Sequence, residues 1–333
     1  MRHRKLGRTG LRVSPLCLGT MTFGIQCNEA ASHAILDKAF DSGITFLDTA
    51  DVYPLGGGLD TVGRTEEFIG SWMAASPSRR DETVLATKFM GQMGPKPWHM
   101  GGSRKHIFEA VEASLRRLGT DHIDLYQIHF PDRSTPIEET MGALDDLVHS
   151  GKVGYLGCSN YPAWELAWAN GKAETNGLTR YDCVQPRYNA LFREFERDLF
   201  ELCEREEIAV IPYNPIAGGL LSGKHSLSSG PAEGTRFTLG TAADRYQDRY
   251  WKQAEFDAIE VLRPIADGAG LTMAEMAFGW VLANPVITAP IVGASRPEQL
   301  DDALRAAATP LPTDVKEAID KATTHFRMGD AQR

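Results

Sequence analysis

Three apolar segments of the sequence end in a polar side chain that could do chemistry. Asp48 closes the run ITFLD, Lys88 follows TVLAT, and His129 closes IDLYQIH, while Tyr53 stands five residues beyond Asp48. A carboxylate beside buried apolar residues is costly unless a cation pairs with it. We therefore expect Asp48 to bind Lys88.

These four residue types together can protonate a carbonyl oxygen. The pKa of a tyrosine is about 10, and a nearby ammonium lowers it. We expect Lys88, held by Asp48, to lower the pKa of Tyr53. Tyr53 would then act as general acid on a carbonyl oxygen that His129 orients. No cysteine or serine is placed to attack the carbonyl carbon, so a hydride from a reduced nicotinamide would complete the reaction.

The elements that must position these residues alternate between apolar runs and helical segments, which predicts a parallel sheet. Strands are expected at 16–19, 44–48, 83–87, 123–129, 153–157, 182–185, 208–213 and 287–292. Eight such units predict an α/β fold, a (β/α)8 TIM barrel that forms a single domain over residues 1–333. The alternative is an open doubly wound sheet, whose dinucleotide form normally carries a G-x-G-x-x-G motif that this chain lacks.

Helix signals support the barrel. Ser103 is expected as the N-cap of a helix over 104–118, and Thr135 with Glu138 forms a capping box for a helix that ends before Gly151. After the seventh strand, a long loop rich in Gly and Ser runs from Tyr213 to about Tyr250. Loops of that length are uncommon and often functional.

In a barrel of this kind, the carboxyl ends of the strands meet at one rim. Asp48, Lys88 and His129 end three consecutive strands, so they are expected at one rim with Tyr53 above them. Taken singly, each has a structural interpretation: a rim ion pair, a core histidine, an ordinary loop tyrosine. Their joint position favours a site.

Composition excludes several other classes of protein. The chain is 42% hydrophobic and 24% charged, with a net charge of −9, which gives no electrostatic reason to bind nucleic acid or an anionic membrane. No apolar run approaches the ~18 residues of a spanning helix. The basic start MRHRKLGRTG is followed by no apolar signal core, so we expect a cytoplasmic protein, monomeric or homo-oligomeric.

Metal and nucleotide-hydrolysis motifs are also missing. The five cysteines form no C-x-x-C pair, and we interpret them as buried small hydrophobic residues. The histidines are scattered, so no metal site is expected. The segment GGLLSGKH resembles a P-loop, but His225 replaces the Ser or Thr that would bind magnesium.

The segments LDTADVY, ATKF and YQIHF resemble the Asp-Tyr-Lys-His tetrad of the aldo-keto reductase superfamily. The resemblance runs from KLGRTGLRVSPLCLGTMTFG to IVGASRPEQL, and GRTEEFIG and IPYNPIAGGLLSGK are similar to bacterial reductases related to potassium-channel β-subunits. It implies a nicotinamide cofactor at the barrel mouth. It also implies that Tyr53 is the proton donor and that the partner is a small carbonyl or alcohol substrate.

The resemblance implies a set of cofactor contacts besides Asp48. Ser159, Asn160 and Gln185 would hold the carboxamide, and Tyr213 would stack on the nicotinamide ring. The other contacts would be Gly19, Thr20, Met21, Asn214, Pro215, Ile216, Ala217, Gly218, Lys224, Arg236, Gly293, Ser295, Arg296 and Gln299.

Residues after the eighth strand bear on the choice of cofactor. Gly293 and Ser295 are expected to begin a helix whose free N–H groups suit a phosphate, and Arg296 suits a 2′-phosphate. We therefore expect NADPH or NADP+. The family usually has asparagine four residues after Gln299, where this chain has Ala303, so NADH stays possible.

The substrate is not identified by the sequence. Phe23, Val52 and Trp98, with Met21, are candidates to line its pocket, and an exposed Trp98 would suit an apolar or planar molecule. Oxidation of an alcohol or sugar, and a cofactor-sensing regulatory protein with little turnover, are alternatives. A hydrolase would need Asp48 and Asp51 as an acid pair, which the match at Lys88 and His129 disfavours.

Overall fold

Eight parallel strands form the sheet at the centre of the molecule. The computed structural model describes residues 1–330. The strands lie in the order β10-β3-β4-β5-β6-β7-β8-β9. A parallel bridge between Val210 and Ile287 and the bond from the Ile291 N–H to the Pro212 carbonyl (2.8 Å) join the two ends of the sheet. The expected (β/α)8 barrel is confirmed. Its strands are β3 (Cys17–Gly19), β4 (Phe46–Asp48), β5 (Val84–Phe89), β6 (Ile123–Ile128), β7 (Val153–Ser159), β8 (Cys183–Gln185), β9 (Ala209–Val210) and β10 (Ile291–Gly293).

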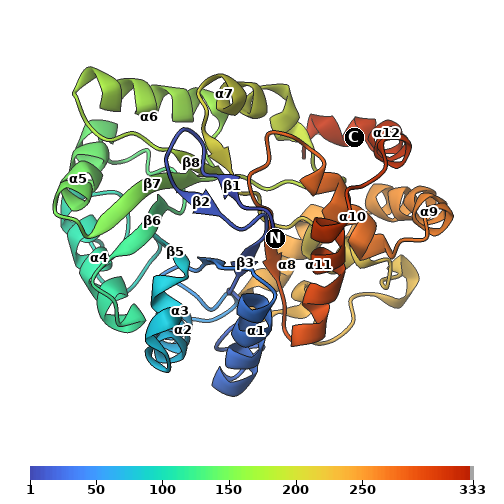
Figure 1. Ribbon diagram of the computed structural model, residues 1–333, viewed down its shortest axis with the longest axis horizontal. Helices are drawn as coiled ribbons and strands as arrows, with labels where there is room; N and C mark the ends of the chain where they lie inside the picture. The colour runs from blue at the N-terminus through green and yellow to red at the C-terminus, as the bar shows by residue number, and fades with distance from the viewer. Residues whose placement is uncertain (331–333) are drawn as a thin grey trace.

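Helices surround the sheet as an outer ring (Figure 1). Ser103 caps its helix as predicted, because its side chain accepts the N–H of His106. The capping box at Thr135 is wrong: Pro136 is the N-cap, and the Thr135 hydroxyl donates to Asp132 instead. The helices are α1 (Glu29–Asp41), α2 (Arg64–Ala74), α3 (Pro77–Asp81), α4 (Arg104–Leu118), α5 (Ile137–His149), α6 (Ala163–Thr175), α7 (Leu199–Arg205), α8 (Ala243–Tyr250), α9 (Gln253–Gly268), α10 (Met273–Leu282), α11 (Asp301–Ala308) and α12 (Thr313–Ala322).

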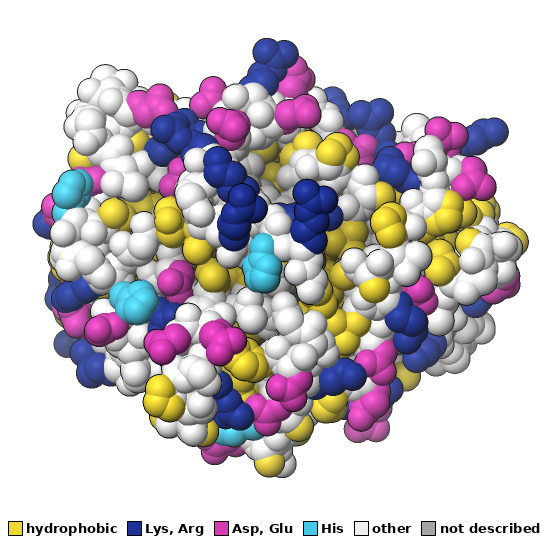
Figure 2. Space-filling view, in the orientation of Figure 1, with side chains coloured by type: hydrophobic (Ala, Val, Ile, Leu, Met, Phe, Trp, Pro, Cys, Tyr) yellow, Lys and Arg dark blue, Asp and Glu magenta, His cyan; other side chains and the backbone are white. Residues whose placement is uncertain are grey.

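An N-terminal hairpin closes the amino end of the barrel. Its strands β1 (Arg4–Lys5) and β2 (Arg12–Val13) pair antiparallel, and Leu6 and Val13 are fully buried in the barrel interior. Gly7 has φ +56°, and a Cβ there would lie 2.4 Å from the Glu207 carbonyl, so only glycine fits. Figure 1 shows the hairpin across the sheet, and Figure 2 shows Lys and Arg side chains over it. The opposite end, with the carboxyl ends of the strands, is left for a site.

The long segment after β9 crosses that opposite end. It contains α8 and four short turns, η2 (Ala217–Ser222), η3 (Leu227–Ser229), η4 (Arg236–Thr238) and η5 (Gly240–Ala242). Phe237 packs against Trp251 at 4.8 Å between ring centroids, and His225 packs against both. The Gln26 side chain donates to the Gly234 carbonyl (3.1 Å), which ties the segment to the loop after β3. The predicted long loop is therefore a folded strap, residues 214–250.

The cysteine prediction is confirmed: Cys17, Cys27, Cys158, Cys183 and Cys203 are all buried and free. Burial raises the pKa of the Cys17, Cys158 and Cys183 thiols well above the usual value, so these side chains behave as apolar core. Within residues 1–330, no helix combines the length and hydrophobicity that crossing a bilayer requires.

Candidate active site

The expected ion pair lies at the carboxyl ends of β4 and β5. The Lys88 ammonium donates to Asp48 Oδ2 at 2.5 Å and to the Thr49 carbonyl at 2.9 Å, and both charged side chains are buried. Burial alone lowers the pKa of Lys88, but attraction to the Asp48 and Tyr53 oxygens reverses the effect and raises it above the usual value. Lys88 is therefore a permanent cation in this site.

Two buried amides complete the shell around Asp48. Asp48 Oδ1 accepts from Gln127 Nε2 at 3.0 Å and from Gln185 Nε2 at 2.9 Å. The sequence reasoning missed Gln127, although an amide inside the apolar strand IDLYQIH was a signal. Gln127 stands two residues before His129, so both face the same side of β6. The Asp48 carboxylate is thus held by an ammonium and two amides.

Tyr53 lies over the Lys88 ammonium, which is 5.1 Å from the centroid of the Tyr53 ring. Tyr53 is buried, with 8% of the residue exposed. Burial raises the pKa of Tyr53 above its usual value near 10, and Lys88 acts in the opposite direction without reversing the shift. The expected effect of Lys88 is present, but burial outweighs it, so Tyr53 keeps its proton at neutral pH.

His129 stands beside Tyr53, with the two ring centroids 5.8 Å apart and the planes at 79°. Phe130 also stacks on the imidazole, with the ring centroids 4.9 Å apart. Burial, Lys88 and Arg245 hold the pKa of His129 well below its usual value. The imidazole is therefore neutral, and it can donate one hydrogen bond to a carbonyl oxygen without competing as an acid.

The residues expected to hold a carboxamide form one hydrogen-bonded group. Tyr213 donates to Asn160 Oδ1 (2.8 Å), and Asn160 Nδ2 donates to the His129 carbonyl (2.9 Å) and to Ser159 Oγ (3.0 Å). Ser159 donates to the carbonyl of Gln185 (2.8 Å), whose side chain reaches Asp48. The rims of β6, β7, β8 and β9 are therefore connected to the Asp48–Lys88 pair.

Residues after β3 meet the strap at the same rim. Thr20 is buried and donates to the Asp48 carbonyl (3.0 Å), and the Arg236 guanidinium contacts Met21 Sδ (3.1 Å) and the Tyr246 hydroxyl (3.2 Å). A Cβ at Gly19 would lie 2.5 Å from the Ile291 side chain. Thr20 thus contacts the end of β4, and Arg236 of the strap contacts Met21 in the loop after β3.

The start of the strap is only partly open. Asn214 accepts from Tyr246 (3.3 Å), and its Nδ2 is buried without a partner among residues 1–330. Pro215 and Ala217 are buried, Ile216 and Gly218 are partly buried, and Lys224 is exposed. A Cβ at Gly218 would lie 2.7 Å from the Tyr246 ring. After Gly223 and Lys224, where the helix of a P-loop would begin, the chain forms only the short turn η3 (Leu227–Ser229).

The helix expected after β10 begins later than predicted. Ser295 and Gly293 precede a single turn, η6 (Pro297–Leu300), and α11 follows with Asp301 and Asp302 in its first turn. The Ser295 N–H donates to Gln299 Oε1 at 2.7 Å, so it is not free. The prediction of a free helix N-terminus is wrong because the Gln299 side chain folds back onto it.

Three further residues in and after this loop were singled out in the sequence. Arg296 is exposed, and a Cβ at Gly293 would lie 3.1 Å from the Arg236 guanidinium. Ala303 is fully buried in an apolar cluster. Two cationic side chains therefore lie on or beside the loop after β10.

The three predicted pocket residues do not share one surface. Val52 is partly buried beside Gly91, and Trp98 is 42% exposed with the Lys96 ammonium 5.2 Å from its ring. Phe23 is fully buried in the apolar layer beneath the rim, so its side chain does not face the mouth. Phe130, 39% exposed and stacked on His129, is an apolar rim residue that the sequence reasoning missed. Among residues 1–330, no cluster of three or more potential metal ligands occurs.

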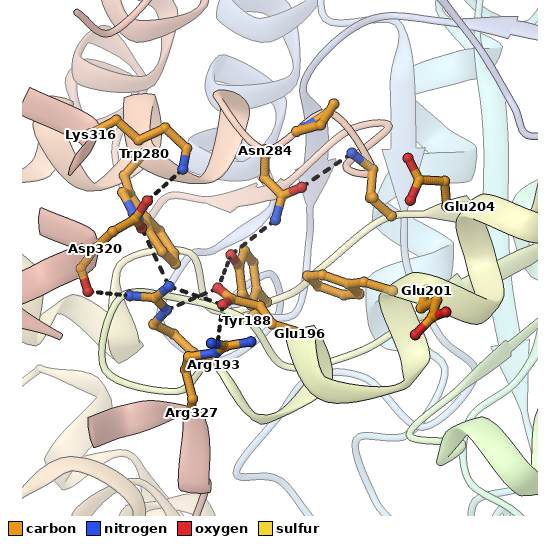
Figure 3. Close-up of a pocket in the computed structure, with 13 residues that line it drawn as sticks. Tyr188, Arg193, Glu196, Glu201, Glu204, Trp280, Asn284, Lys316, Asp320 and Arg327 are labelled. Carbon is orange, nitrogen blue, oxygen red and sulfur yellow. Dashed lines mark hydrogen bonds and ion pairs between the residues drawn. The ribbon is translucent and has the colours of Figure 1, made fainter. Parts of the chain in front are cut away.

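A cavity of about 380 Å³ lies away from these residues, between α7, α10, α12 and the turn η1 (Glu194–Arg197). Figure 3 shows Arg193 bonded to Glu196 and Asp320 at its centre. Arg193 also donates to Thr323 Oγ1 (2.9 Å), and Tyr188 donates to Glu196 (2.7 Å). These groups satisfy one another, so the network ties the C-terminal helix to the barrel.

Removing the central cation of this network is expected to destabilise the protein. Arg193→Ala removes the buried cation that Glu196 and Asp320 share, but Glu196 keeps Arg327 and Asp320 keeps Lys316, so the expected cost is about 1–3 kcal/mol of unfolding free energy. Urea unfolding measures the loss, and turnover per folded molecule should not change. The control Arg205→Ala removes an exposed ion pair with Glu201 and should cost under about 1 kcal/mol. Equal losses in the two variants would contradict this role for Arg193.

Comparison with known proteins identifies the family of this chain. The model of the aldo/keto reductase family matches residues 15–324. An uncharacterized oxidoreductase, YrpG of Bacillus subtilis, is 39% identical, covering 96% of this chain and 95% of the relative.

Two further relatives are named for different roles. A "Probable voltage-gated potassium channel subunit beta" of Arabidopsis thaliana is 35% identical over 96% of this chain and 95% of its own. Norsolorinic acid reductase A of Aspergillus parasiticus is 33% identical over 96% of this chain and 80% of its own. The protein belongs to the aldo/keto reductase family and is an oxidoreductase that acts on carbonyl groups.

Proposed function

We propose that this protein is an NADPH-dependent reductase of aldehydes or ketones, with Tyr53 as the proton donor. The observation that carries the proposal is the stack of groups at the rim. A buried Asp48–Lys88 pair lies beneath Tyr53, and a neutral His129 lies beside it. Carbonyl reduction is assisted by hydrogen-bond donors directed at the carbonyl oxygen, and Tyr53 and His129 are two such donors.

The rim residues fit a nicotinamide nucleotide. The orphaned Asn214 Nδ2 is a donor for an oxygen-rich ligand, and Tyr213 offers a partly exposed aromatic face beside Asn160. Arg236 and Arg296 supply positive charge for phosphate groups. Ser159, Asn160, Gln185 and Tyr213 would hold the nicotinamide end, and the strap residues with Arg236 and Arg296 the phosphates. When bound, the cofactor supplies the hydride.

The chain's own residues do the proton chemistry. His129 donates a hydrogen bond to the carbonyl oxygen of the substrate. This bond holds that oxygen between the rings of His129 and Tyr53. Tyr53 transfers its proton to that oxygen as negative charge develops there. Lys88 stabilises the phenolate that remains, because a fixed cation in a buried site favours the charged form of its neighbour. Asp48, with Gln127 and Gln185, keeps the Lys88 ammonium in place.

The proposal is tested by NADPH consumption with a reactive aromatic aldehyde, followed by a panel of ketones and alcohols. Turnover supports the reductase, and turnover of alcohols alone would indicate an oxidative enzyme. The similarity to a channel β-subunit favours a second candidate, a cofactor-sensing protein. Tight NADPH binding without turnover on the whole panel would support that candidate and contradict the first.

The choice of NADPH rests on Arg296. Arg296→Ala is expected to weaken NADPH binding about 10–100-fold, since a charge-assisted hydrogen bond contributes about 1.5–3 kcal/mol, and to leave NADH binding nearly unchanged. Titration of protein fluorescence with each cofactor measures both constants. Arg305→Ala is the matched control, because Arg305 lies on α11 and pairs with Glu275 and Asp302. Equal losses for both cofactors at position 296 would refute the 2′-phosphate assignment.

A further inference from the structure

Asp51 is a buried acid with no assigned task. It lies between the end of β4 and Tyr53, it is 0% exposed, and within residues 1–330 neither of its carboxyl oxygens has a hydrogen-bond partner. Asp51 is fully buried and Asp48 is bound to Lys88, so the two do not form an exposed acid pair. A fully buried carboxyl group without partners needs a physical explanation.

The other charged groups around Asp51 form pairs with one another. Glu66 on α2 is buried and accepts from Arg117 Nε (2.7 Å) and from Thr87 Oγ1 (2.6 Å). Lys88, the other nearby cation, is bound to Asp48. Two cations thus face three carboxyl groups, and Asp51 is the one that no cation contacts.

An ionised Asp51 would be an uncompensated buried charge, which costs several kcal/mol. A carboxyl group in this position takes up a proton instead. Burial, followed by repulsion from Glu66, raises the pKa of Asp51 well above its usual value, and Arg117, the backbone N–H of Val52 and Lys88 oppose the shift without reversing it. On β6, the Tyr126 hydroxyl is also buried without a described partner, and its pKa is raised by burial, by Asp51 and by Glu66. The neutral forms of both groups are therefore favoured.

The backbone connects Asp51 to the catalytic groups. The Asp51 N–H donates to the Lys88 carbonyl (3.0 Å), and the Thr49 N–H donates to the Ala86 carbonyl (2.9 Å). The Tyr53 N–H donates to the carbonyl of Ala50 (3.2 Å). The segment that carries Tyr53 is thus fastened to β5 at Ala86 and at Lys88, and Asp51 provides the second of these two attachments.

We propose that Asp51 is a positioning residue that keeps a proton in the folded enzyme, so that the space behind Lys88 and Tyr53 stays uncharged. Its effect on turnover rests on the proposed function, whereas its protonation does not. If Asp51 ionised, its negative charge would favour the protonated forms of Lys88 and Tyr53 and would repel Glu66. The neutral acid avoids both effects.

The sign of the pH dependence follows from the raised pKa of Asp51. Because the folded state holds this proton more tightly than the unfolded chain, the contribution of Asp51 to stability is complete below the unfolded carboxyl pKa near 4. That contribution is lost as the pH rises toward the folded-state pKa. A neutral side chain at position 51 removes this loss.

The test compares the wild type with Asp51→Asn and Asp51→Leu, two neutral variants that differ in polarity. Infrared difference spectra should show the band of a protonated carboxylic acid at neutral pH in the wild type, and both variants should lack it. Between about pH 5 and about pH 8, the Tm of the wild type should fall relative to that of either variant by about 2 °C or more. Asp145→Asn is the control. Burial raises the pKa of Asp145, but its bonds to Thr179 and His149 outweigh that and lower it, so no acid band should be lost there.

The pH dependence of turnover is a further test, because a purely structural role of Asp51 would leave it unchanged. In Asp51→Asn, the alkaline decline of kcat should lie at lower pH than in the wild type, because no charge at position 51 raises the pKa of Tyr53. An unchanged infrared band and equal slopes of Tm against pH would overturn the proposal, whatever the activity. An inactive wild type that still shows the band and the Tm difference would refute the proposed function alone.

Discussion

Tyr53→Phe is expected to lower kcat about 10²–10⁴-fold, the usual contribution of a positioned proton donor, and to leave NADPH binding nearly unchanged. The phenylalanine ring keeps the contacts of Tyr53 with His129 and with the Lys88 ammonium. Only the hydroxyl group that carries the proton is lost. NADPH oxidation with an aromatic aldehyde measures the first effect, and cofactor titration of protein fluorescence measures the second.

A matched control separates chemistry from structure. Tyr155 on β7 packs in the barrel interior, so Tyr155→Phe removes a hydroxyl group elsewhere in the same barrel and should keep its turnover. Any residual activity of Tyr53→Phe should also lose its alkaline decline, since the group that titrates is gone. Equal loss of turnover and NADPH binding in Tyr53→Phe would mean that Tyr53 is structural.

The barrel could be predicted because its strands are short, apolar and regularly separated by helices. Each of the eight strands overlaps a segment expected from the sequence. The hairpin β1–β2 was missed because strands of two residues leave no periodic pattern. The strap was recognised by its length and its Gly and Ser content. Its order depends on aromatic contacts such as Phe237 with Trp251, which span residues too far apart for local patterns to indicate.

The arrangement of the candidate site at the rim was predictable for a different reason. Barrel topology alone brings the ends of neighbouring strands together, so Asp48, Lys88 and His129 needed only correct strand assignments. The loop after β10 was not predictable in this way, because whether Gln299 folds back onto Ser295 depends on a side-chain rotamer. The direction of the shift in the pKa of Tyr53 was predicted wrongly for a similar reason. The burial of Tyr53 depends on the elements packed around it, which the sequence did not indicate. Its closeness to Lys88 could be expected from the neighbouring strands.

Lys88→Met is expected to abolish most turnover and also to destabilise the fold. Methionine fills a similar volume but leaves Asp48 as a buried carboxylate without its cation, which costs about 3–5 kcal/mol of unfolding free energy. Gln127 and Gln185 still donate to Asp48, so the variant should fold. Turnover should fall at least ~10²-fold, because the phenolate left on Tyr53 has no cation to stabilise it.

The double variant Asp48→Asn/Lys88→Met separates the two losses. It removes the uncompensated charge, so it should recover most of the stability that Lys88→Met loses, because replacing both members of a buried ion pair is far less costly than replacing one. It should not recover turnover, because the ammonium beneath Tyr53 is still missing. Denaturant unfolding and NADPH oxidation on the same preparations decide the matter. If the double variant regains turnover, Lys88 only offsets the charge of Asp48. If it is no more stable than Lys88→Met, Asp48 is not an ionised carboxylate in the folded protein.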